Sequence, residues 1–133
     1  MADRPLEFWD LTEWQAIVTP WPDPVKKAIG ANLRVLQHGE MPASHCKTLQ
    51  KFPIPLLELW HPSGPRVICT AEYAGLTGHL HVLDAFEKDS KDGKKMRPSD
   101  RDRIERRAKE LKKRMDALKK LSEQTHAVRK KLH

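Results

Sequence analysis

The stretch LLELWHPSGPRVICTAEYAGLTGHLHVLDAFEK, residues 56–88, decides the fold. Its runs 56–61, 66–73 and 79–88 are rich in the apolar, aromatic and β-branched residues that favour strands. The PSGP and AGLTG segments that separate these runs have the composition of turns. The pattern predicts three antiparallel strands joined in a meander.

The last of these strands carries polar side chains among its apolar ones. Strict alternation places Asp84 on one face between Val82 and Phe86. A carboxylate in such a position either pairs with a cation or takes part in proton transfer. The expected face around Asp84 consists of Leu80, Val82, Asp84, Phe86 and Lys88, and the opposite face of His79, His81, Leu83, Ala85 and Glu87.

One short strand and two helices are expected before the meander. Residues 6–9 alternate as a strand does, and residues 11–18 form a first helical stretch. A second helix begins at Asp23, which serves as the N-cap ahead of Pro24, and ends at Gly39. Its apolar face consists of Val25, Ala28, Ile29, Leu33 and Leu36.

A loop is predicted for residues 39–55, which contain Gly39, Pro42, Pro53 and Pro55. The sequence thus places no regular element between the second helix and the meander.

A long basic helix is predicted at the C-terminal end. It starts at Pro98 with Ser99 as its cap, and an apolar seam runs along one side. The seam weakens beyond Leu121, which predicts a domain over residues 1–121 and a helical extension over 122–133. The expected fold class is α+β: a small antiparallel sheet with two N-terminal helices and this helix. The seam consists of Ile104, Ala108, Leu111, Met115 and Leu118.

Positive charge is concentrated at one end of the chain. Residues 1–87 contain 7 basic and 10 acidic side chains, whereas residues 88–133 contain 18 basic and 8 acidic ones. A basic segment attached to a mildly acidic body indicates a polyanionic partner such as RNA, and a solvated charged helix is the alternative.

Several classes of protein fit the composition poorly. Cys46 and Cys69 are the two cysteines, so a disulfide framework and a cysteine-rich zinc site are disfavoured. The start carries acidic residues where a signal peptide needs basic ones, and no run is apolar enough to span a membrane. The sequence predicts a cytoplasmic protein without membrane partners, bound metal or other cofactor.

A cluster of cations is expected where the sheet ends. Arg66 opens the second strand of the meander and Lys88 closes the third. Such groups can bind successive phosphates and stabilise the charge that develops during RNA cleavage, in which the 2′-hydroxyl is the nucleophile. The alternative for Arg66 is an ion pair with Glu58 or Glu72 across the hairpin. The neighbouring loop adds Lys91, Lys94, Lys95 and Arg97.

The order of elements and motifs resembles the phage-derived HigB-like toxins of type II toxin–antitoxin modules, within the RelE/ParE superfamily. The resemblance covers residues 6–113. It rests on colinear motifs: Val25 with Ile29-Gly30 and Leu33, Gln37-x-Gly39-Glu40-x-Pro42, Lys47-x-Leu49, Leu57-Glu58-Leu59, Gly64-x-Arg66-Val67, and Leu83 to Ser90 followed by Pro98.

The resemblance implies a RelE-like toxin that cleaves mRNA with the ribosome and is neutralised by a HigA-like antitoxin with a helix-turn-helix domain. It implies that Arg66 binds the scissile phosphate and that Lys88 contacts RNA or assists proton transfer, with Lys47 and Lys51 as further backbone contacts. Asp84 stands where the family usually has histidine.

Two other departures from the family are Trp60 in place of arginine and Asp89 in place of a second lysine. Together with Asp84, they favour an alternative function, a non-catalytic protein of the same fold that binds RNA or the antitoxin. Inhibition of gyrase, as in ParE-like relatives, is a third hypothesis.

Overall fold

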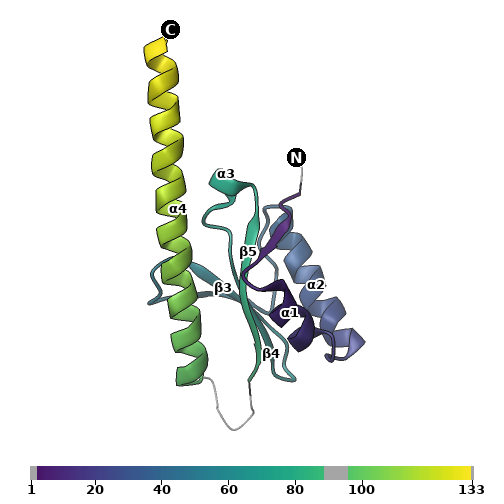
Figure 1. Ribbon diagram of the computed structural model, residues 1–133. Coiled ribbons are helices and arrows are strands. Elements are labelled where there is room, and N and C mark those ends of the chain that lie inside the picture. The colour runs from purple at the N-terminus through teal and green to yellow at the C-terminus, as the bar shows by residue number, and fades with distance from the viewer. Residues whose placement is uncertain (1–2, 89–95, 133) are drawn as a thin grey trace.

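A computed structural model describes residues 3–88 and 96–132, and within the last helix it leaves the side chains of residues 127 and 129–132 undescribed. The chain forms a sheet of five strands in the order β1-β5-β4-β3-β2, with helices on both faces (Figure 1). Helices α1 and α2 lie on one side of the sheet and α4 on the other. The α+β class is therefore confirmed.

The predicted meander is present. Strands β3 (Leu56–Trp60), β4 (Pro65–Thr70) and β5 (Leu80–Glu87) pair antiparallel in sequence order. The segment between β4 and β5 contains one short helix, α3 (Ala74–Thr77), which ends at Gly78 in the left-handed conformation.

The sheet is mixed rather than wholly antiparallel. Strand β1 (Leu6–Phe8) pairs parallel with β5, with Leu6 opposite Leu80. The predicted loop at 39–55 was wrong in part, because Cys46–Leu49 forms strand β2 and pairs antiparallel with β3. Strand β2 has only four residues and pairs with β3 alone, so its formation depends on β3 more than on the β-propensity of its own residues.

The predicted alternation along β5 was also wrong, because the register shifts within the strand. Ile68 lies opposite Asp84 and Cys69 opposite Val82, which leaves Leu83 as an extra residue. Val82 and Ala85 consequently pack on the α1 and α2 side, whereas Leu83 packs on the α4 side.

The two N-terminal helices cover one face. Helix α1 (Leu11–Val18) is capped by the Asp10 side chain, which accepts a hydrogen bond from the Glu13 amide at 3.0 Å. Helix α2 (Asp23–Gln37) starts one residue earlier than predicted, so Asp23 lies in its first turn and Pro22 occupies the cap position. The predicted face of α2 is buried at Val25, Ile29, Leu33 and Leu36 but not at Ala28, which is exposed.

Helix α4 (Pro98–Leu132) covers the opposite face. Its predicted seam packs through Ile104, Ala108 and Leu111 against Ile68 and Phe86. Because α4 begins at Pro98, Ser99 lies in its first turn rather than at its cap. The helix continues through the predicted extension to Leu132.

The turn between β3 and β4 requires glycine at position 64. Gly64 has φ +126°, and a Cβ there would lie 2.8 Å from the Lys88 carbonyl oxygen. We expect Gly64→Ala to lower the free energy of unfolding by about 2 kcal/mol, measured by urea denaturation. The matched control is Gly30→Ala on α2, which meets nothing within 4 Å and should raise stability by about 0.5–1 kcal/mol. Equal effects of the two substitutions would contradict this role for Gly64.

Candidate functional site

Two of the residues predicted to bind RNA, Lys47 and Arg66, share one face of the sheet. Arg66 lies opposite Phe86 on β5 and opposite Trp60 on β3. Phe86 packs beneath α4, and directly opposed residues share a face, so Arg66 and Trp60 are on the α4 side. Lys47 lies opposite Glu58, which is two residues before Trp60 and therefore on the same face. We call Lys47, Glu58, Trp60 and Arg66 the sheet-end cluster.

Arg66 is held in place within this cluster. Its Nε lies 3.1 Å from Glu58 Oε1, in an ion pair without hydrogen-bond alignment. Its Nη1 donates hydrogen bonds of 2.9 and 3.0 Å to the carbonyl oxygens of His61 and Pro65. With a side chain only 14% exposed, the guanidinium is a fixed positive charge rather than a mobile one.

The partners of Arg66 are equally well placed. Glu58 is buried, and its Oε2 lies 3.9 Å from the exposed Lys47 Nζ. Trp60 is half-buried, and the Arg66 guanidinium carbon lies 5.7 Å from the centroid of its ring. The ring centroids of Trp60 and His45 are 4.5 Å apart. Of the two partners that the sequence offered for Arg66, Glu58 is the one in contact with it.

Lys88 extends this cluster at the end of β5. It comes two residues after Phe86, and its backbone N–H donates to the Gly64 carbonyl at 2.8 Å. Alternation along the strand therefore places Lys88 on the face of the sheet-end cluster.

The other predicted cations lie elsewhere. Arg97 donates to Asp100 at 2.9 Å and to the Glu87 carbonyl at 2.7 Å, which joins the start of α4 to the end of β5. Lys51 is exposed, with φ +68°, and its carbonyl is 3.4 Å from Arg101. Lys91, Lys94 and Lys95, together with Asp89, lie outside the described residues.

Asp84 pairs with cations of α4. Its side chain is fully buried; Oδ2 accepts hydrogen bonds of 3.0 and 2.7 Å from Arg103, and Oδ1 lies 3.4 Å from Arg107 Nη1. Oδ1 also accepts the Ala85 amide at 3.0 Å. Pairing with a cation, one of the two alternatives open for Asp84, is thus the arrangement found.

The same arginines connect Asp84 to other elements. Arg103 donates to Asp100 at 2.9 Å, and Arg107 donates to Glu13 of α1 at 2.7 Å and to the Leu83 carbonyl at 2.8 Å. Burial raises the pKa of the Asp84 carboxyl, and Arg103 and Arg107 oppose that rise. Burial lowers the pKa of Arg103, but its bonds to Asp84 and Asp100 outweigh burial and raise it overall. This network fixes α4 to the sheet.

Within residues 3–88 and 96–132, no three His, Cys, Asp or Glu side chains are grouped so as to hold a metal ion. His79 and His81 are 6.3 Å apart between ring centroids, and burial lowers the pKa of His81, whose Nε2 lies 3.1 Å from the Thr77 hydroxyl. Burial also raises the pKa of Cys46, which disfavours a reactive thiolate there.

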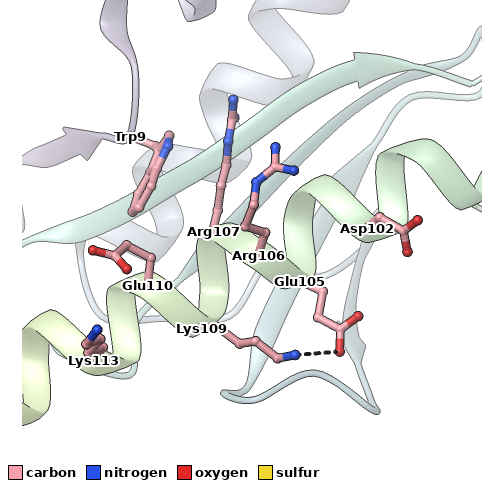
Figure 2. Close-up of a pocket in the computed structure, with 8 residues that line it drawn as sticks. All are labelled: Trp9, Asp102, Glu105, Arg106, Arg107, Lys109, Glu110 and Lys113. Carbon is pink, nitrogen blue, oxygen red and sulfur yellow. Dashed lines mark ion pairs between the residues drawn. The ribbon is translucent and has the colours of Figure 1, made fainter.

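A wide groove of about 650 Å³ lies beside Trp9 and α4, away from the sheet-end cluster. Figure 2 shows that its charged side chains come from successive turns of one helix and point in different directions. Several are paired, including Lys109 with Glu105 at 3.7 Å. A surface of mixed sign without convergent polar groups does not define a binding site. Its lining consists of Trp9, Asp102, Glu105, Arg106, Arg107, Lys109, Glu110 and Lys113.

Comparisons of the chain with protein-family models, with curated proteins and with solved structures found no match. In the described residues, no helix is long and apolar enough to cross a lipid bilayer.

Three residues were absent from the predicted site. Glu58 was expected only as an ion-pair partner, yet it brings a carboxylate between two cations. Arg103 and Arg107 were not singled out, although each precedes a seam residue of α4 and so borders its buried face.

Proposed function

We propose that this protein is the toxin of a type II toxin–antitoxin module, with the RelE-like arrangement of the HigB-like family, and that it cleaves mRNA. The observation that carries the proposal is the placement of Lys47 and Arg66 against the buried carboxylate of Glu58, with Lys88 directly after the neighbouring end of β5. Fixed positive charge beside a carboxylate is what metal-independent RNA cleavage requires. A helix-turn-helix antitoxin and the ribosome are the partners that follow from the family resemblance.

A reaction can be assigned to these side chains. Glu58 takes the proton of an RNA 2′-hydroxyl, whose oxygen then attacks the adjacent phosphorus. Arg66 stabilises the negative charge of the pentacoordinate phosphorane, and Lys88 donates a proton to the departing 5′-oxygen. The bond from phosphorus to the 2′-oxygen forms as the bond to the 5′-oxygen breaks, which yields a cyclic phosphate and a 5′-hydroxyl.

Substrate binding is assigned to the edge of the same cluster. Lys47 is exposed and can contact a phosphate, and the indole of Trp60 offers a surface for base stacking. The proposed reaction assigns no step to Asp84, whose carboxylate accepts hydrogen bonds from Arg103 and lies 3.4 Å from Arg107 Nη1, and its part in proton transfer stays a prediction.

A non-catalytic RNA-binding protein is the second candidate. The observation that favours it is the ion pairing of Arg66 with Glu58, which satisfies both charges without a substrate. Both candidates predict RNA binding that weakens with salt, but only the first predicts strand scission.

Expression of the chain without an antitoxin separates these candidates. We expect growth arrest together with new 5′-hydroxyl ends in mRNA, because cleavage removes translatable templates. The measurement is culture growth combined with mapping of RNA 5′ ends, and purified protein is assayed on mRNA with and without ribosomes. Soluble, folded protein that binds RNA and leaves it intact would favour the second candidate. Growth arrest with intact mRNA and inhibited DNA supercoiling would favour gyrase as the target.

A further inference from the structure

Helix α4 is much longer than the body that it covers. Its 35 residues extend about 52 Å. The contacts with the sheet end near Met115, which packs at the edge of the core. We call residues 116–132 the distal segment; it projects past the sheet at the end opposite the junction of β5 with α4 (Figure 1).

The distal segment carries exposed apolar side chains along one stripe. Leu118, Leu121 and Val128 are 41%, 60% and 56% exposed. Their spacings of three and seven residues place them on one side of the helix. Leu118 and Leu121 line a shallow groove with Ser122, Thr125 and His126. An unsupported helix of this length is marginal in water, so the apolar stripe indicates a surface that a partner covers.

The charge around this stripe restricts the partner. Over the distal segment, residues 116–132, the sequence contains five basic and two acidic residues. A second copy would bring one basic helix against another, which is unfavourable for pairs of like charge. RNA would satisfy the charges but offers no apolar groove for leucines, and the stripe lacks the aromatic residues of membrane-surface helices.

We propose that the distal segment docks into an acidic partner protein, with Leu118, Leu121 and Val128 as anchors in an apolar groove that acidic side chains border. The recognition mode is an amphipathic helix paired with a complementary surface. Arg66 pairs with Phe86 near the end of β5, and Arg97 joins that end to the start of α4. Because the distal segment lies at the other end of α4, docking leaves the sheet-end cluster open. The interaction positions the protein and does not block its proposed RNA site.

The test uses the full chain and a defined acidic probe. The probe is a fluorescently labelled helical peptide of about three heptads, with leucine at positions a and d and glutamate at e and g. Fluorescence anisotropy should show saturable binding by the wild-type chain. The double substitution Leu121→Ser and Val128→Ser should weaken binding by at least about tenfold, because it removes two of three anchors.

Two controls separate anchoring from charge alone. Leu11→Ser removes a leucine of α1 that is similarly exposed and should leave binding unchanged. Lys119→Gln with Lys120→Gln should weaken binding and reduce its dependence on salt. Circular dichroism establishes that each variant keeps its helical content.

Several results would overturn the proposal. The first is equal binding by the wild type and the Leu121→Ser, Val128→Ser variant, which would reduce the interaction to charge. Others are tighter, leucine-dependent binding to oligouridylate or to vesicles of phosphatidylcholine and phosphatidylserine, or leucine-dependent dimerisation in sedimentation experiments. RNA cleavage by the same variants is measured separately, so this proposal can fail while the proposed function stands.

Discussion

Replacing Asp84 with alanine is expected to lower the free energy of unfolding by about 3 kcal/mol. The carboxylate is fully buried and accepts hydrogen bonds from Arg103 and the Ala85 amide. Its removal leaves two guanidinium groups at the boundary between the sheet and α4 without their shared partner. The expected loss is at the low end of the range for breaking a buried ion pair, because Arg103 keeps Asp100 and Arg107 keeps Glu13. Urea denaturation at neutral pH measures the change.

The pKa shifts of Asp84 and Arg103 are related to the expected change in the free energy of unfolding. Burial raises the pKa of Asp84, which means that part of the favourable pairing offsets desolvation. The bonds to Asp84 and Asp100 raise the pKa of Arg103 in spite of its burial, so the pairing favours the charged arginine. Four protein donors approach this one carboxylate within 3.4 Å, so the unpaired groups that its removal leaves cost more than its burial does.

A matched control distinguishes burial from charge. Asp116→Ala removes a carboxylate from the exposed pair with Lys112, at 3.1 Å, and should change stability by less than about 0.5 kcal/mol. If Asp84→Ala were as mild as Asp116→Ala, the network would not fix α4 to the sheet.

The meander could be predicted because its strands carry their own signals. Turn residues bound each run of apolar and β-branched residues, so β3, β4 and β5 appear close to their expected limits. The strand Cys46–Leu49 has no such signal: it is short, follows Pro42 and depends on pairing with β3. The register shift at Leu83 could not be predicted either. Alternation of apolar and polar residues along a strand does not indicate where one strand has an extra residue relative to its partner.

The partners of Asp84 show a second limit of sequence reasoning. An aspartate between Val82 and Phe86 indicated either an ion pair or proton transfer, and the choice depended on residues 19 and 23 positions away. Helix α4 offers many cations, and only packing of its seam on the sheet selects Arg103 and Arg107. The contact of Arg66 with Glu58 could be predicted from the sequence, because both residues lie on one predicted hairpin.

The largest functional effect is expected at Arg66. In the proposed reaction its guanidinium stabilises the phosphorane, a role whose loss typically lowers the rate by about a hundredfold to a thousandfold. Arg66→Ala should therefore reduce kcat for mRNA cleavage by about that factor and relieve growth arrest. Arg66→Lys keeps a charge but loses the fixed bonds to the His61 and Pro65 carbonyls, so it should recover activity only in part.

Substitutions of Glu58 and Lys47 separate the proposed roles of proton transfer and RNA binding within the sheet-end cluster. Glu58→Gln removes the proposed proton acceptor and should lower kcat by about a hundredfold or more while RNA binding persists. Lys47→Ala removes an exposed phosphate contact, so it should raise KM and weaken the salt dependence of binding with little change in kcat.

Circular dichroism and urea denaturation of every variant distinguish a loss of catalysis from a loss of folding. This control is needed because Arg66→Ala also leaves the buried Glu58 carboxylate without its nearest cation. Full activity in a folded Arg66→Ala variant would contradict a catalytic role for the sheet-end cluster.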